Sequence, residues 1–529
     1  MPDTAPTDSS ATPPVTVTQV LCAFAYANDL AFGLQLEDTL RSAYVAWRVA
    51  TELGLSDAAR HDAYVTALLK DAGCTSWTTE LAAAWHTDEI AARRDFLIFE
   101  PSNGMPAFVR WMRRHVGQDE ASLAKLRRYL NVLRTSRPFF TEGFATTVTV
   151  ASRIAGRLGM SPGVQQALLA VFEQWDGSGY PEGRAGAQIP QVARVVLPTF
   201  FLVPVHRVSG RAAAIELATT LRGHASDPSV ADAFLALAAD DTFWAELEGP
   251  DIQGRVLTLE AAEPVTHADD LLDAAALAFA DFIDLKSRHA AAHSRRVGAV
   301  AEQLARAMRC PQEEVALIRR AGLMHDLGMV AIPSYLLERP WSSLSEAERD
   351  QFRLHPYHGE RILQRVPAFT PLAALVGNHH ERFDGSGYYR GLRGEHQALG
   401  ARIIAVADRL DTLTHDAPGV PAVPIDVALE TIGSEPFDPA VFAALRGALE
   451  GSDNPRQTSP QPRPAGLTDR EVEVLRLAAS GLPRREIARR LQITENTARH
   501  HLEHIYNKTG ATNRVSATLF AMEHGLLAG

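Results

Sequence analysis

The chain has 529 residues, of which 46% are hydrophobic and 22% are charged, and its net charge is −11. This composition is typical of a water-soluble globular protein, and the length is sufficient for three or four domains. The acidic balance argues against nucleic-acid binding by the whole chain, although basic residues outnumber acidic ones from Gly466 onward. No run of 18 apolar residues occurs, so no membrane partner is expected.

The N-terminus is rich in Pro, Ser and Thr and lacks the basic and then apolar pattern of a signal peptide. We therefore expect residues 1–16 to form a disordered leader. The three cysteines, Cys22, Cys74 and Cys310, lie far apart without a pairing pattern. Such thiols are typical of a reducing compartment, so the sequence predicts a cytoplasmic protein.

An internal repeat follows the leader. WDGSGYPEG (175–183) corresponds to FDGSGYYRG (383–391), and LLKDAG (68–73) corresponds to LMHDLG (323–328). The first copy is longer between these two motifs. We expect its additional residues, near 95–140, to be helical, because their apolar residues recur at helical spacing.

The first copy, residues 17–250, lacks most of the metal-binding side chains that the second copy, residues 268–450, contains. At the positions of four potential ligands it carries Lys70, Val171, Phe172 and Phe200. Asp71 alone survives, and one carboxylate among lysine and phenylalanine cannot hold two metals. We expect this half to be a structural or regulatory copy packed on the intact one. The alternative is a sensory pocket for an unknown ligand.

The second copy holds an ordered set of potential metal ligands in helical contexts: His293, His325, Asp326, His355, His379, His380 and Asp408. A mixed set of histidine and carboxylate suits divalent transition metals such as Fe, Mn, Ni or Zn. Two such metals a few ångströms apart activate a water and hold a phosphoryl group for in-line displacement. Asp326 is the natural candidate for the carboxylate that bridges them.

A small helical module ends the chain. Residues 451–465 are rich in Pro, Ser and polar residues and are expected to form a flexible linker before residues 466–529. Thr468 and Glu471 form a capping box that begins the first helix of the module, and Gly481 ends it.

Pro483 is expected at the first position of a second helix, and Thr494 at the N-cap of a third that extends to about Lys508. The apolar residues of the third helix should face inward: Ala498, Leu502 and Ile505. A short helix, a tight turn and a polar, mildly basic helix predict a helix-turn-helix that binds DNA.

Five motifs of the second copy closely resemble the HD-GYP branch of the HD phosphohydrolases: HSRRV (293–297), HDLGMVAIP (325–333), RLHPYHGERIL (353–363), HHERFDGSGYYRG (379–391) and ARIIAVADRLDTLT (401–414). That family is all-helical and is known for metal-dependent hydrolysis of cyclic dinucleotides, notably cyclic di-GMP. The resemblance implies an all-α fold, with two HD-GYP-like domains of which the first is degenerate.

The resemblance also implies roles for individual residues. The seven potential ligands would hold two divalent transition metal ions, and Asp326 and His355 would be catalytic. Apart from the resemblance, we expect Arg382, Asp384 and Arg390, which lie in or near the HHE motif, to contact the nucleotide or phosphoester. His289 lies where some members carry a glutamate for a third metal, and we do not include it among the ligands.

Two departures from the family pattern concern the substrate rather than the metals. The motif HDxGK has Met329 in place of its lysine, and the GYP signature reads Gly387-Tyr388-Tyr389. A lysine at position 329 would hold a substrate phosphate as a point charge, which methionine cannot do. We therefore expect a metal-dependent phosphodiesterase of weakened activity.

Residues 464–527 strongly resemble the LuxR/FixJ/GerE type of DNA-binding domain, through LTDREVEVLRLAASG, EIARRL, ITENTARHH and IYNKTGATNRVSAT. The resemblance implies DNA contacts by Thr497, Arg499, His500, Lys508 and Arg514. Lysine and arginine would hold phosphates, and side chains early in the third helix would reach base edges. Such domains bind two half-sites as dimers, so a homodimer is expected.

Together these features predict a DNA-binding transcription regulator with a two-metal HD-GYP-like phosphohydrolase body, which hydrolyses or senses a cyclic dinucleotide or another phosphoester. The alternative is a catalytically inactive transcription factor whose body senses a metal or a ligand. The complete ligand set favours hydrolysis, whereas Met329 and Tyr389 favour sensing.

Overall fold

The computed structural model describes residues 15–99, 104–117, 120–259, 267–450 and 463–527. Within these ranges the chain forms helices and no strand, apart from two isolated β-bridges. The predicted all-α fold is therefore confirmed. The expected leader, except for its last two residues, and most of the expected linker lie outside the described residues.

The N-terminal half is a bundle of thirteen described helices, several of which begin at the caps that the sequence supplies. Thr16 and Ser56 accept hydrogen bonds from backbone amides three residues on, and Ser161 caps α8 ahead of a proline. The helices are α1 (Val17–Ala31), α2 (Asp38–Glu52), α3 (Asp57–Leu69), α4 (Thr78–Trp85), α5 (Glu89–Phe99), α6 (Gly104–His115), α7 (Ser122–Arg157), α8 (Pro162–Leu169), α9 (Gln191–Val196), α10 (Thr199–Leu221), α11 (Pro228–Ala238), α12 (Asp241–Leu247) and α13 (Ile252–Thr258).

One helical stretch in this half, Gln191–Leu221, is long and apolar enough to cross a membrane by length and composition. Its apolar window is 72% buried inside the protein. That burial is what a core helix of a globular bundle shows, and the stretch bends at Gly210.

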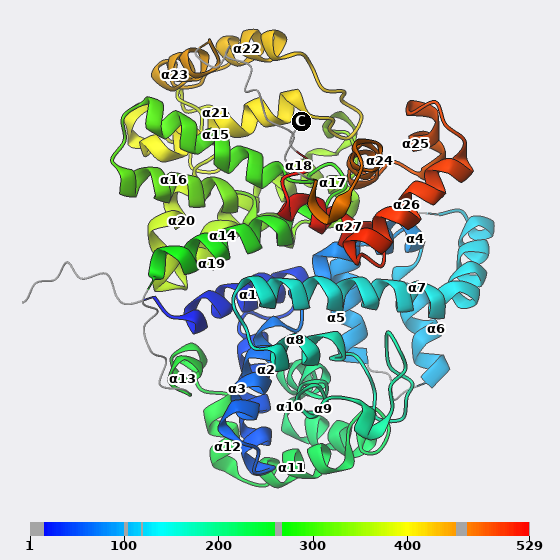
Figure 1. Ribbon diagram of the computed structural model, residues 1–529. Helices are drawn as coiled ribbons and strands as arrows, with labels where there is room; N and C mark the ends of the chain where they lie inside the picture. The colour runs from blue at the N-terminus through cyan, green and yellow to red at the C-terminus, as the bar shows by residue number, and fades with distance from the viewer. Residues whose placement is uncertain (1–14, 100–103, 118–119, 260–266, 451–462, 528–529) are drawn as a thin grey trace, which may run out of the picture.

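The second half places ten further helices against the first (Figure 1). Phe24 of α1 stacks on Phe279 of α14 with ring centroids 3.8 Å apart, so one apolar core runs through both halves. The helices are α14 (Ala268–Asp284), α15 (His293–Ala307), α16 (Gln312–Met324), α17 (Ser334–Leu337), α18 (Glu346–Arg353), α19 (His355–Gln364), α20 (Thr370–Gly377), α21 (Leu399–Thr414), α22 (Ile425–Ser434) and α23 (Pro439–Glu450), with a 3-10 turn η4 (Leu327–Ala331).

The two GSGY loops are built by the same hydrogen bonds. The carboxylates of Glu173 and Glu381 each accept from backbone amides nine and eleven residues further on, at 2.7 and 2.9 Å in both loops. The tyrosine of each motif donates its backbone N–H to the carbonyl eight residues earlier, at 3.1 and 3.2 Å. The sequence repeat therefore corresponds to a repeat of local structure.

The first copy has an internal cation at the position where the second has potential metal ligands. Lys70 forms a buried ion pair with Asp71, and its ammonium lies 4.6 Å from the centre of the Phe200 ring. Phe172 packs edge-on against Phe200. An ammonium and two aromatic rings therefore fill this position, and Asp71, the one retained counterpart of a potential ligand, is paired with Lys70.

The C-terminal module contains α24 (Asp469–Ala479), α25 (Arg484–Arg490), α26 (Glu495–Thr509) and α27 (Arg514–Glu523). The predicted capping box of Thr468 and Glu471 is present, and Thr494 caps α26 as expected. Pro483 differs from expectation, because it is the N-cap of α25 with extended backbone rather than its first helical residue. The module has its own apolar core.

This module lies on the body through α27, which runs beside α7 (Figure 1). Arg514 forms an ion pair with Glu80 of α4, and Glu523 pairs with Arg157 of α7 at 3.0 Å. Leu519 of α27 belongs to the core of the body, not to that of the module. Polar and apolar contacts therefore fix the position of the module against the two halves.

Candidate metal centre

The potential ligands converge on one point, and all but Asp408 come from the ends of helices or the turns beside them. In chain order, His293 begins α15, His325 follows α16, Asp326 precedes η4, His355 begins α19, His379 and His380 follow α20, and Asp408 lies in α21. Gly328 permits the close approach of η4 and α19, because a Cβ there would lie 1.8 Å from the carbonyl oxygen of His355.

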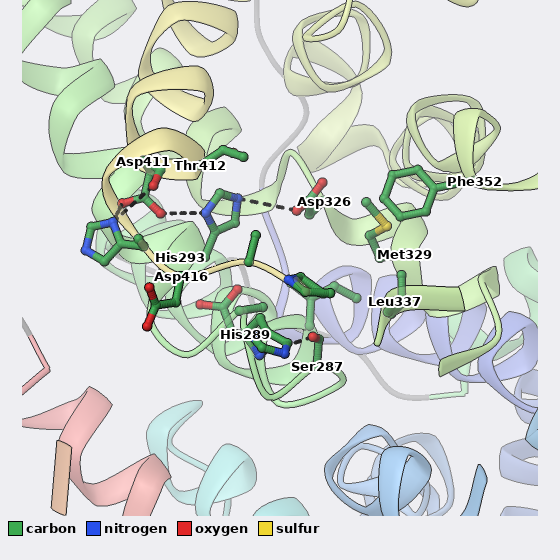
Figure 2. A pocket seen from close by; sticks show the side chains of 16 residues that line it. Ser287, His289, His293, Asp326, Met329, Leu337, Phe352, Asp411, Thr412 and Asp416 are labelled. Atoms are coloured by element: carbon green, nitrogen blue, oxygen red, sulfur yellow. Dashed lines mark hydrogen bonds and ion pairs between the residues drawn. The ribbon is translucent and has the colours of Figure 1, made fainter. Parts of the chain in front are cut away.

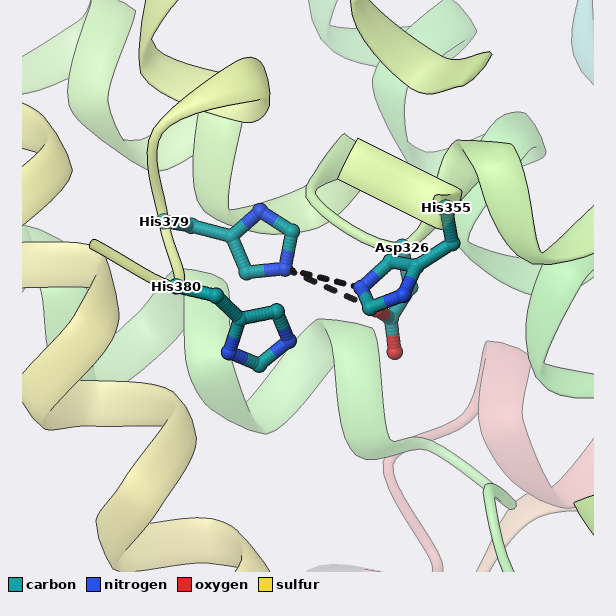
Figure 3. A group of neighbouring side chains, drawn as sticks. All are labelled: Asp326, His355, His379 and His380. Carbon is teal, nitrogen blue, oxygen red and sulfur yellow. Dashed lines mark hydrogen bonds and ion pairs between the residues drawn. The ribbon is translucent and has the colours of Figure 1, made fainter. Parts of the chain in front are cut away.

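Six of these side chains form two groups that share Asp326: one with His293 and His325, and one with His355, His379 and His380, which Figure 3 shows. Asp326 Oδ2 lies 3.5 Å from Nε2 of both His293 and His325. The other oxygen, Oδ1, lies 3.4 Å from Nε2 of His355 and 3.9 Å from Nε2 of His379. Each carboxylate oxygen therefore faces one pair of histidines, as a bridge between two cations requires.

Asp408 is a second carboxylate that lies beside both groups. Its Oδ1 is 3.4 Å from His293 Nε2 and 3.9 Å from His325 Nε2. Its Oδ2 is 4.0 Å from Nδ1 of His380, which otherwise belongs to the Asp326–His355–His379 group.

Backbone carbonyls orient three of the histidines. Nδ1 of His325, His355 and His379 lies 2.8, 2.9 and 2.6 Å from the carbonyl oxygen three residues earlier. A carbonyl only accepts, so each Nδ1 carries the proton and donates it. The lone pair of each Nε2 is left pointing into the site, as is usual for a histidine that binds a metal.

Two of these lone pairs face each other, an arrangement that is favourable when a cation lies between them. Nε2 of His355 and Nε2 of His379 are 3.2 Å apart, and both lack a proton because the Nδ1 atoms hold it. Two ligand nitrogens at about 2.0–2.1 Å from one metal would lie roughly 3.0 Å apart at a right angle and roughly 3.4 Å apart in a tetrahedron. The observed separation falls within that range, so these residues fit a divalent cation.

Asp411 orients the fourth histidine and was not predicted from the sequence. It accepts from His293 Nδ1 at 2.7 Å and from Arg296 at 2.6 and 2.9 Å. These bonds hold the pKa of the Asp411 carboxyl well below its usual range, against the effect of burial. The only signal in the sequence is its place one turn after Asp408, on the same face of α21.

Burial and neighbouring side chains together set the charge states of His379, His380 and Asp326. It lowers the pKa of His379 and of His380 well below the usual range, so both are neutral and able to bind a metal. Burial acts to raise the pKa of Asp326, but the surrounding histidines hold it well below its usual range, so this carboxylate is ionised.

A cavity of about 210 Å³ opens on His293 and on Asp326, the carboxylate that the two groups share (Figure 2). His293, Asp326 and Asp411 form part of its polar wall, and Met329 and Phe352 form part of its apolar wall. Met329 thus faces the cavity where the family has a lysine. Because its side chain packs with apolar neighbours, it gives this wall no positive charge.

The three residues predicted to contact substrate have partners within the protein. Arg390 forms an ion pair with Glu360 at 2.8 Å, and Arg382 lies 4.0 Å over the Phe437 ring. Asp384 accepts from the backbone and hydroxyl of Ser386 within its own turn. None of the three lines the cavity.

His289, placed one turn before His293 by sequence spacing, precedes α15 in a turn. It lines the cavity, and its Nε2 lies 3.9 Å from Glu338.

The predicted DNA-contacting residues of α26 fall into two sets. Arg499 and His500 are about half exposed, and each is near Glu503 of the same helix, at 3.7 and 3.4 Å. Thr497 shares a hydrogen bond of 2.7 Å with the Thr494 hydroxyl at the start of the helix. The start of α26 is therefore accessible in the described structure.

Lys508 and Arg514 already have acidic partners. Lys508 pairs with Glu471 at 2.7 Å and so completes the capping box of α24, while Arg514 pairs with Glu80 of the body. In this arrangement Arg514 holds the module on the body.

Comparisons with known proteins agree with this architecture. Residues 278–441 match the HD domain family, and residues 465–521 match the bacterial regulatory proteins of the luxR family. The chain therefore contains an HD domain and a LuxR-type DNA-binding domain. HD domains are metal-dependent phosphohydrolases, which supports divalent metal binding by the two groups.

Named relatives are phosphodiesterases. The chain is 29% identical to the 3′3′-cGAMP-specific phosphodiesterase 3 of Vibrio cholerae over 82% of this chain and 94% of that protein. It is 40% identical to the cyclic di-GMP phosphodiesterase response regulator RpfG of Xanthomonas campestris over 30% of this chain and 42% of that one. The crystal structure of a V. cholerae cyclic GMP-AMP-specific phosphodiesterase matches with a TM-score of 0.58 and 26% identity, over 83% of this chain and 98% of that one. A match of that extent includes much of the degenerate half.

Proposed function

We propose that this protein is a DNA-binding transcription regulator whose body is a two-metal phosphodiesterase for a cyclic dinucleotide. The observation that carries the proposal is the carboxylate of Asp326, whose two oxygens each face a different pair of histidines. We further propose that one metal is held by the His293–His325 pair and the other by His355, His379 and His380, with Asp326 and Asp408 shared.

When bound, the two cations supply an activated water and positive charge for the phosphoryl oxygens. The protein residues prepare the site for that chemistry. The backbone carbonyls fix the histidine tautomers, and Asp411 holds the His293 ring in place. Phe352 and Met329 shield one side of the cavity from water, which strengthens electrostatic interactions inside it.

We infer that a mixed cyclic dinucleotide, 3′3′-cGAMP, is the first substrate to test. Support comes from the V. cholerae relative, which this chain matches over 94% of its length, whereas the cyclic di-GMP phosphodiesterase matches over a much shorter part. Fe, Mn, Ni and Zn are the metals that the donor set suits.

A second candidate function is ligand sensing without turnover. The specific observation that favours it is the apolar Met329 at the wall of the cavity. In that case the body would bind the cyclic dinucleotide and its occupancy would act on the DNA-binding domain.

Incubation of the metal-loaded protein with 3′3′-cGAMP and with cyclic di-GMP, followed by chromatography of the products, distinguishes the two functions. We expect a linear dinucleotide from wild type and none from Asp326→Ala. If wild type binds the nucleotide but leaves it intact with each metal, and also leaves a nitrophenyl phosphodiester intact, the phosphodiesterase proposal is wrong and the sensor remains.

A further inference from the structure

A second, larger cavity lies between the HD domain and the DNA-binding domain. Its volume is about 500 Å³. The HD domain contributes four residues within 288–296 and six within 415–421 to its lining, and the DNA-binding domain contributes residues at the ends of α24 and α25 and Leu527. We call it the interdomain cleft.

The interdomain cleft is continuous with the cavity at the metal centre. Four residues line both: His289, His415, Asp416 and Ala417. A molecule that enters the metal cavity from this side therefore passes the rim of the cleft.

The cleft is rich in positive charge. Four arginines line it: Arg288, Arg296, Arg476 and Arg490. Arg296 is neutralised by Asp411, whereas among the described residues the ion pairs of Arg288 and Arg490 are long, at 3.7 Å to Glu80 and 3.9 Å to Glu486. Arg490 is about half exposed, and Asp416 is the one acidic side chain among the described residues of the lining. The lining thus favours an anionic ligand.

The small size of the metal cavity also indicates that a large ligand would extend beyond it. Pockets that enclose drug-sized ligands measure about 300–1,000 Å³. The cavity of about 210 Å³ at the metals is below that range, and the interdomain cleft is within it. A cyclic dinucleotide has two nucleosides and two phosphates, so only the part that carries the reacting phosphate fits at the metals. The remainder must lie outside.

We propose that the interdomain cleft binds the second half of the cyclic dinucleotide, with Arg490 of the DNA-binding domain and Arg288 of the HD domain as contacts for its phosphate or base edges. This inference rests on the proposed function, because it assumes that a cyclic dinucleotide binds at the metal centre. It adds that the substrate touches the DNA-binding domain itself.

The docked position of the module is what places Arg490 in the lining. The ion pairs of Arg514 and Glu523 and the burial of Leu519 in the core of the body hold that position. The nucleotide would therefore add contacts to the docked arrangement only. By linkage, the ligand stabilises docking to the same extent that docking strengthens ligand binding.

The test uses the full-length, metal-loaded protein and two substrates of different size. A bis-nitrophenyl phosphate is small and reports on the metal cavity alone, whereas 3′3′-cGAMP reaches into the cleft. We expect Arg490→Ala to lower kcat/KM for 3′3′-cGAMP by about tenfold. This figure corresponds to the lower end of the free energy of a hydrogen bond to a charged group, and we choose the lower end because Arg490 is half exposed. Hydrolysis of the nitrophenyl ester should be unchanged.

Two further variants define the result. Arg490→Glu should have a larger effect of the same kind. Arg489→Ala is the matched control, because Arg489 precedes Arg490 in α25, is exposed and does not line the cleft. Unchanged 3′3′-cGAMP kinetics in both Arg490 variants would overturn the cleft assignment and leave the proposed function intact. Equal losses with both substrates, or an equal loss in Arg489→Ala, would also overturn it. If wild type neither binds nor hydrolyses a cyclic dinucleotide, the proposed function fails and the cleft assignment fails with it.

Discussion

Replacement of Asp411 by asparagine tests how the protein holds one half of the metal centre. Asn has the same shape as Asp but no charge, so His293 and Arg296 lose a charged acceptor. That acceptor is almost fully buried, with 5% of its side chain exposed, and its bonds to the two residues measure 2.6–2.9 Å. Substitution of such an orienting partner typically weakens metal binding by about 10- to 100-fold, which corresponds to roughly 1.4–2.7 kcal/mol.

The geometry predicts that this loss is confined to one metal. His355 and His379 are oriented by their own backbone carbonyls and do not contact Asp411. We therefore expect Asp411→Asn to release one metal at a chelator concentration about 10- to 100-fold lower than wild type does, and to release the other as wild type does.

The assay is a chelator titration with metal analysis of the retained protein. Asp426→Asn, an exposed change in the first turn of α22, is the matched control. Thermal unfolding monitored by circular dichroism shows whether the variant is folded. An unchanged titration, or equal weakening of both metals in a folded variant, would refute the role assigned to Asp411.

Three further outcomes are expected. Met329→Lys should raise kcat/KM for a cyclic dinucleotide by about one to two orders of magnitude, because a charge-assisted hydrogen bond contributes roughly 1.5–3 kcal/mol. Strong wild-type turnover that the lysine does not improve would contradict this. Lys508→Ala should lower the free energy of unfolding of the DNA-binding domain by about 1 kcal/mol, because Glu471 loses its ion-pair partner. An unchanged melting curve would contradict this prediction. DNA binding by the full chain should weaken steeply as salt rises, and a salt-independent affinity would argue against phosphate contacts.

The local features of the fold were predictable because they depend on neighbours in sequence. The capping box of Thr468 and Glu471 needs only a spacing of three residues, and the caps at Thr494 and Gly481 follow the same kind of rule. The helical class followed from the motifs. Pro483 shows the limit of such rules, because position alone does not separate an N-cap from the first helical residue.

The candidate ligands were recognisable because motif spacing places them at helix ends, but their supporting partners were not. Asp411 contacts a histidine that lies 118 residues earlier in the chain. Arg514 pairs with Glu80 across 434 residues, and this contact depends on how α27 packs on the body. Long-range packing of this kind leaves no periodic signal in one sequence, so the docked module and the interdomain cleft were visible only in three dimensions.

The proposed chemistry requires two metals that share Asp326. Metal analysis of the full-length protein, purified without oxygen and again after reconstitution, measures this. We expect about two transition metals per chain in wild type, and loss of most of the metal from a folded Asp326→Ala variant, because both groups lose their shared oxygen donor. Wild type that holds no metal after reconstitution, or an Asp326→Ala variant that retains both, would contradict the two-metal centre.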